Sequence, residues 1–187
     1  IFKEILKEKR APHFQFDVTS RLNLWSGEEA RKCIEGILPY VDIFFCSEDT
    51  AKTDNLEKKA NVKEIMESFA AEYPISVIAS TQRTVLSPKI HNFTSVIYDA
   101  KAKKFYEEKP YENIEVVDRI GSGDAYCSGV LYGLLREDGG VQVLFAMEMP
   151  AVQQEYYPGD MPSLDREEIE NIIHDHETVG YHSEMNR

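Results

Sequence analysis

The stretch VVDRIGSGDAYCSGVLYGLL, residues 116–135, decides the fold that we expect of this chain. A short apolar run ends in an aspartate, two glycines flank a serine, and Asp124 then opens a helical pattern. A glycine-rich turn between a strand and a helix commonly binds anions, because the amide groups of the helix N-terminus point into the turn. A carboxylate at that position therefore needs an explanation.

The residues of the turn suggest one. Gly121 and Gly123 lack a Cβ atom, which permits positive φ angles and the close approach of a ligand. With the amide groups of a helix that begins near Ser122, they would form an anion hole for a phosphate. Asp124 would repel that phosphate, but it could accept a proton from a hydroxyl that attacks it. We therefore predict that Asp124 is a general base. An aspartate that only stabilises the helix N-terminus is the more common alternative.

Composition restricts the classes of partner. The chain has 187 residues with 33 acidic and 21 basic side chains, and its net charge of -12 argues against a nucleic-acid partner. A small phosphorylated ligand remains compatible, since backbone amides can bind it. The three cysteines show no CxxC spacing and indicate a reducing, cytoplasmic compartment. The longest apolar runs are too short to cross a bilayer, so no membrane partner is expected.

The order of the predicted elements indicates an α/β protein. Helical and strand-like segments alternate over the first 80 residues, with helices at 26–38 (stopped by Pro39) and 62–73, which is typical of a parallel sheet. A hairpin with its turn at 99–103 and a strand at 114–118 precede the glycine turn. Further helices are expected at 141–149 and 163–176. The chain opens inside an amphipathic helix, residues 1–10, so we expect that an upstream part is missing.

The segment DRIGSGDAY, residues 118–126, resembles the C-terminal signature of the ribokinase (PfkB) family of carbohydrate kinases, D-x-x-G-[AGS]-G-D-[AS]-[FY]. Four further segments resemble its 2-keto-3-deoxygluconate kinases: FDVTSRLNLW (16–25), LPYVDIFFCSEDTAK (38–52), STQRTVLS (80–87) and YYPGDM (156–161). The resemblance covers residues 1–175, the C-terminal half of such a kinase, and leaves 176–187 as a tail. It implies a ribokinase-like doubly wound sheet with helices on both faces and with the N-terminal portion absent.

The resemblance also implies roles for individual residues. Asp124 would deprotonate the sugar hydroxyl, and Gly121–Gly123 would surround the phosphate that is transferred from ATP. Arg21 matches an arginine that contacts the acidic sugar, and a guanidinium suits a carboxylate. Arg83 matches the stretch that lines the nucleotide phosphates. Glu48 matches a glutamate that organises Mg²⁺ through water. The implied partners are therefore a sugar acid and ATP with Mg²⁺, and the implied assembly is a homo-oligomer.

Three departures from the family pattern keep alternatives open. Thr19 and Ser47 stand where the family has asparagine, and Thr50 stands where it has a second glutamate. A kinase of another sugar, such as fructose, is one alternative, and a non-catalytic nucleotide-binding remnant of a kinase is another. A hydride-transferring dinucleotide enzyme is disfavoured, because Gly129 falls outside the spacing of that glycine fingerprint.

Overall fold

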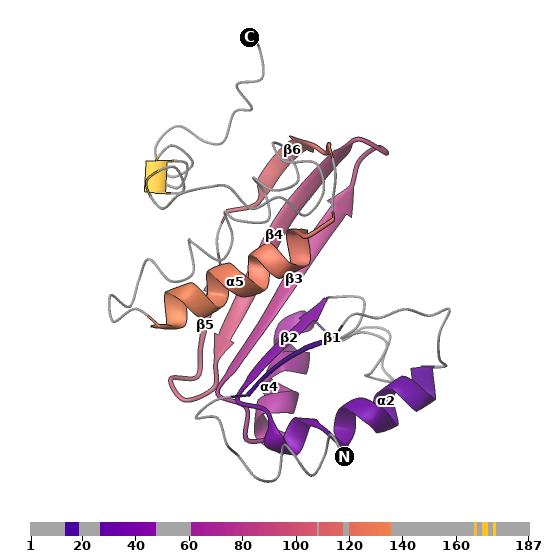
Figure 1. The fold of residues 1–187 in the computed structure, drawn as a ribbon, viewed down its shortest axis with the longest axis vertical. Helices are drawn as coiled ribbons and strands as arrows, with labels where there is room; N and C mark the ends of the chain where they lie inside the picture. The colour runs from indigo at the N-terminus through magenta and orange to yellow at the C-terminus, as the bar shows by residue number, and fades with distance from the viewer. Residues whose placement is uncertain are drawn as a thin grey trace. The chain divides into compact units, whose positions relative to one another are not determined.

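The computed structural model describes residues 14–18, 27–47, 61–107, 109–117 and 120–135, with positions 167, 170, 171 and 174 (Figure 1). Strands and helices alternate along these ranges in the following order: β1 (Gln15–Val18), α2 (Gly27–Glu35), the 3₁₀ helix η1 (Leu38–Tyr40), β2 (Ile43–Ser47), α4 (Val62–Glu72), β3 (Val77–Val85), β4 (Ile90–Asp99), β5 (Lys104–Glu107), β6 (Tyr111–Glu115) and α5 (Ser122–Leu135). The predicted α/β class is confirmed.

The strands form one mixed sheet with the order β1-β2-β3-β4-β5, and β6 pairs with β4. β1, β2 and β3 are parallel, with Phe16 opposite Phe44 and Phe44 opposite Ile78. β4 and β6 are antiparallel, with His91 opposite Ile114. The parallel part is the part that the helix–strand alternation of the first 80 residues predicts. Contacts divide the chain into two units, residues 1–81 with 96–106, and residues 82–95 with 107–187.

Both faces of the parallel strands are buried in the first unit. One face carries Phe44 and Ile78, which lie in a cluster with Ile34 near the end of α2 and Ile65 of α4. Successive side chains of a strand point to opposite faces. Ala79, which is 0% exposed, therefore lies on the other face and is buried there as well. Burial of both faces is the condition that parallel strands of a doubly wound sheet meet.

The ends of the helices follow local rules that the sequence shows only in part. Asn61 caps α4 through its side chain, which accepts from Lys63 N–H at 3.2 Å, and Glu64 accepts from Asn61 N–H at 3.3 Å. α2 ends at Glu35, before the residue predicted to stop it. After α2, Ile37 N–H donates to the carbonyl oxygen three residues back, Ile34 O, at 2.8 Å. Pro39 lies at the start of η1, where the helix needs no N–H donor.

The predicted hairpin turn is confirmed between β4 and β5. Asp99 Oδ1 accepts from Ala102 N–H at 2.8 Å, and Lys103 takes a positive φ of 53°. A second turn that sequence reasoning missed joins β3 to β4, where Leu86 N–H donates to Ile90 O at 3.0 Å.

β6 pairs irregularly with β4 in the second unit. A bulge separates the pairs formed by His91 and Phe93. Asn113 takes a positive φ of 59°, a left-handed backbone that asparagine adopts more readily than most residues. Its N–H donates to Asn92 Oδ1 at 2.9 Å. β6 ends at Glu115, three residues before the predicted strand end.

Positions 167, 170, 171 and 174 are helical and exposed, at the spacing of one helix face, in agreement with part of the helix predicted at 163–176. The helices predicted at 1–10 and 141–149 lie outside the described residues. Among the helices in the described ranges, none combines the length and apolar content that a membrane span requires.

Candidate active site

The glycine turn has the backbone that a phosphate-binding turn needs. Gly121 has a φ of 84°, in the left-handed region that favours glycine. Ala125 N–H donates to Gly121 O at 2.8 Å and closes the first turn of α5. The amide groups in the first turn of an α-helix have no carbonyl four residues earlier within the helix to which they could donate. The predicted turn and helix start are therefore confirmed.

Of the two reasons that the sequence suggests for glycine, positive φ and close approach of a ligand, only the second applies at Gly123. Gly123 has a helical backbone, which any residue can adopt, so no positive φ angle calls for glycine at this position. A Cβ atom placed on Gly123 would meet nothing within 4 Å. Open space therefore borders the backbone beside the first-turn amides, and a side chain there would occupy room available to a ligand.

Asp124 is exposed in the first turn of α5. Tyr126 and Val130 bury one face of this helix, at 3% and 1% exposure, and so fix its rotation. Asp124 lies two positions before Tyr126, about 200° around the helix, and thus on the opposite face. Burial of α5 consequently directs the carboxylate away from the core.

A contact of Asp124 that sequence reasoning missed comes from the next helical turn. Ser128 Oγ donates to the Asp124 carbonyl oxygen at 2.8 Å. Serine in a helix interior commonly bonds the carbonyl four residues back, and this spacing is the signal that would have predicted the contact. The bond holds the backbone of Asp124 rather than its carboxylate.

The remaining predicted site residues are placed only in part. Arg83 lies on β3 and is exposed, in the same unit as the glycine turn. Ser47 at the end of β2 pairs in parallel register with Thr81 of β3. Arg21 and Glu48 lie outside the described residues, as do Thr19 and Thr50.

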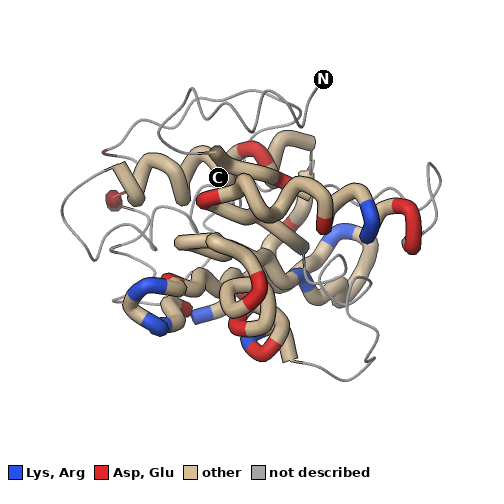
Figure 2. The backbone as a smooth tube through the Cα atoms, turned by 90° about the horizontal axis from the view of Figure 1, so that it is seen from below, with Lys and Arg blue, Asp and Glu red and all other residues tan. Residues whose placement is uncertain are grey.

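Charged residues of both signs occur in the described part of the chain. Figure 2 shows acidic and basic positions interspersed along the described backbone. Within the described ranges, no group of three or more His, Cys, Asp and Glu side chains could hold a metal ion. A nucleotide-borne Mg²⁺ needs no such cage, since it keeps several waters and binds mainly through phosphates.

Comparison with known proteins identifies the fold. No protein-family model matches the chain. A 2-dehydro-3-deoxygalactonokinase of Haloferax volcanii is 23% identical over 158 residues, which are 84% of this chain and 46% of that protein. A PfkB family carbohydrate kinase from Listeria grayi has a TM-score of 0.81 at 26% identity, over 93% of this chain and 54% of its own. A 2-dehydro-3-deoxygluconokinase from Thermotoga maritima has a TM-score of 0.80 at 24% identity, over 92% and 53% of the two chains.

A more distant neighbour carries a nucleotide. A ribokinase II candidate from E. coli, solved with ATP and Mg²⁺, has a TM-score of 0.70 at 18% identity, over 93% of this chain and 52% of its own. The structural neighbours of the chain are thus PfkB carbohydrate kinases, and the predicted ribokinase-like fold is confirmed. The chain spans about half the length of the curated relative and of these solved kinases.

Proposed function

We propose that residues 1–175 form the C-terminal part of an ATP-dependent sugar kinase that phosphorylates 2-keto-3-deoxygluconate, with residues 176–187 as a tail. The observation that carries the proposal is the glycine turn at the start of α5. There Gly121 adopts a positive φ, open space borders Gly123, and the carboxylate of Asp124 stands exposed beside them. Similarity to kinases of 2-keto-3-deoxy sugar acids supports the substrate class.

In the proposed reaction a hydroxyl of the sugar attacks the γ-phosphorus of MgATP. Asp124 takes the hydroxyl proton as the new O–P bond forms, and the bond from the γ-phosphorus to the bridging oxygen breaks, with the electron pair leaving on ADP. The amide groups of the turn donate to the phosphoryl oxygens, whose negative charge the helix N-terminus stabilises. The product is the phosphorylated sugar acid.

Three further residues complete the proposed site. Arg83 would contact the nucleotide phosphates, which its exposure on β3 allows. Arg21 would bind the carboxylate of the sugar acid through a bidentate pair. Glu48 would orient the waters of the Mg²⁺ that ATP carries. Glu48 follows Ser47, the last residue of β2, and ligands of open α/β sheets bind beyond the carboxyl ends of the strands.

The decisive experiment measures ADP release with MgATP and 2-keto-3-deoxygluconate, using the longest native chain that contains these residues. Asp124→Asn removes the base and keeps the size of the side chain, so turnover should fall by about 10²–10⁴-fold. Glu112→Gln, on an exposed position of β6, is the matched control and should keep the parent rate. Equal turnover in the parent and Asp124→Asn would exclude Asp124 as the base.

The identity of the sugar needs its own comparison. The curated relative acts on the galactonate isomer, so 2-keto-3-deoxygalactonate is the first competing substrate, followed by fructose. We expect both keto acids to exceed fructose in kcat/KM, and Arg21→Ala to lower kcat/KM for the acids alone. A preference for fructose, unaffected by Arg21→Ala, would assign the site to a neutral sugar.

A non-catalytic nucleotide-binding role is the second candidate. The replacements at Thr19, Ser47 and Thr50 favour it, because they remove side chains that the family pattern places beside the nucleotide and metal. Binding of MgATP by folded protein, without turnover of any of the three sugars, would support this role over the kinase.

A further inference from the structure

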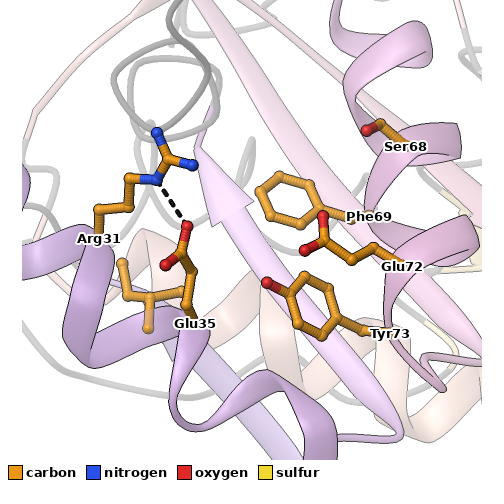
Figure 3. A pocket seen from close by; sticks show the side chains of 7 residues that line it. Arg31, Glu35, Ser68, Phe69, Glu72 and Tyr73 are labelled. Atoms are coloured by element: carbon orange, nitrogen blue, oxygen red, sulfur yellow. Dashed lines mark hydrogen bonds and ion pairs between the residues drawn. The ribbon is translucent and has the colours of Figure 1, made fainter.

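A small hollow lies between α2 and α4 in the first unit (Figure 3). Its volume is about 40 Å³, which suits one small polar group. The lining comes from residues near the C-terminal ends of both helices: Arg31, Ile34, Glu35, Ser68, Phe69, Glu72 and Tyr73. None of these residues has a part in the proposed phosphoryl transfer.

The electrostatics of the hollow favour a positive group. Glu35 is the last residue of α2 and Glu72 is the last residue of α4, where each helix dipole has its negative end. The last turn of α4 contains no basic residue. Arg31 is the single cation among the lining residues that the structure describes, and two carboxylates and two helix C-termini outweigh it there.

Arg31 leaves part of Glu35 accessible. Arg31 Nε donates to Glu35 Oε1 at 2.6 Å, while the two side chains remain 42% and 40% exposed. An exposed pair at this spacing is weak, because solvent screens it and both side chains lose conformational freedom. A second cation can therefore compete for the Glu35 carboxylate.

Aromatic rings form the opposite wall. The rings of Phe69 and Tyr73 lie 6.3 Å apart at 30°, and Phe69 meets the core ring of Phe44 edge-on at 5.6 Å. Figure 3 shows the two rings and Glu72 across the hollow from Arg31 and Glu35. The face of an aromatic ring attracts cations, and it also accepts the apolar carbon next to an ammonium group.

Both carboxylates affect the pKa of the Tyr73 phenol. Burial, a hydrogen bond to Glu72 and the charges of Glu72 and Glu35 all raise the pKa of Tyr73, against a smaller opposing effect of Arg31. Carboxylates from two different helices thus act on one hydroxyl at the wall of the hollow.

We propose that the hollow between α2 and α4 binds a small organic ammonium group, the group that free amines and lysine side chains share. The N–H groups would donate to Glu72 and Glu35, and the adjoining carbon would lie against Phe69 and Tyr73. An anion would meet two carboxylates at this place. The proposal goes beyond the kinase function and does not depend on it.

The test is a titration of the full ¹⁵N-labelled chain with methylammonium chloride at neutral pH, followed by amide chemical shifts. Sodium chloride at equal ionic strength is the reference. We expect saturable shifts in the last turns of α2 and α4 with methylammonium alone. Glu72→Gln should weaken binding by about tenfold or more, as expected when a hydrogen bond to a charged group is lost.

Glu28→Gln is the matched control, because Glu28 stands on α2 outside the hollow and pairs with Lys32 at 2.8 Å on the exposed face. This variant should bind methylammonium as the parent does. The proposal would be overturned if sodium chloride caused equal amide shifts. It would also be overturned if Glu28→Gln and Glu72→Gln weakened methylammonium binding equally, because binding would then depend only on the general charge of the chain.

Two larger probes identify the source of the ammonium group. Tighter binding of a short lysine-containing peptide than of spermidine would assign the hollow to a protein partner, and the reverse order would assign it to a free polyamine. Either order supports an ammonium site. Failure of both probes and of methylammonium would refute it.

Discussion

Gly121 and Gly123 stand two positions apart in one turn but need glycine for different reasons. Alanine at Gly121 would adopt a φ of 84°, a left-handed backbone that costs a residue with a Cβ atom about 1–2 kcal/mol. Gly121→Ala should therefore lower the free energy of unfolding by that amount, as measured by urea denaturation.

Gly123→Ala is predicted to separate ligand binding from folding. The added methyl group meets no protein atom within 4 Å, and alanine in a helix is about 0.5–1 kcal/mol more favourable than glycine. Stability should therefore stay equal or rise, while the affinity for MgATP, followed by calorimetry, should fall because the methyl group narrows the space beside the amides. Unchanged affinity in a stabilised Gly123→Ala variant would show that no phosphate approaches this backbone.

Tyr73 provides a prediction about pH. Burial, with the hydrogen bond to Glu72 and the nearby carboxylates, raises its folded-state pKa above the unfolded value of about 10. A raised pKa stabilises the folded chain fully below pH 10, and this contribution is lost as the pH rises through the folded pKa. Tyr73→Phe should therefore lose less stability than the parent between pH 9 and 11, in the window set by the pKa of about 10. Parallel stability curves of parent and variant would contradict the assignment.

At the scale of elements, α4 depends on its cap. Asn61→Ala removes the side-chain acceptor for Lys63 N–H and should lower the free energy of unfolding by about 1 kcal/mol. Asn61→Asp keeps an acceptor at the same position and should remain close to the parent. The measurement is the urea midpoint of the three proteins. A loss in the aspartate variant equal to that in the alanine variant would show that the cap contributes little.

Local signals predicted those elements whose boundaries are set by neighbouring residues. The amphipathic pattern of residues 62–73 predicted α4, and the polar run at 99–103 predicted the turn between β4 and β5. The glycine turn was predictable because Gly121 and Asp124 belong to a long local pattern. The proposed substrate class comes from the resemblance, and the similar proteins are sugar kinases by name.

Non-local contacts account for what the sequence did not predict. Val116, which follows β6, donates its N–H to Lys89 O at 2.7 Å, in the turn between β3 and β4, and the two residues are distant in the sequence. The hollow between α2 and α4 likewise requires Glu35 and Glu72 to converge from separate helices. Periodicity places each of these residues on its own element but carries no information about the element it meets.

At the scale of the whole molecule, β3 and β4 contribute residues to both units. β4 supplies Val96 and Tyr98 to the core cluster of the first unit, and Phe93 to a cluster with Tyr111 and Ile114 in the second. A strand that belongs to two units links their stability, since its backbone must be ordered for either core to form.

Ile78→Ala tests that link. Ile78 is 0% exposed in the core of the first unit, and its truncation should cost about 2–5 kcal/mol. If the shared strands couple the units, the loss should appear equally in hydrogen exchange at Ile114 of β6, which belongs to the second unit. Leu135→Ala, at a position that is 85% exposed, is the control and should leave exchange unchanged. Protection at Ile114 that stays at the parent level in Ile78→Ala would mean that the second unit opens independently, and the continuity of β3 and β4 would then carry no cooperativity.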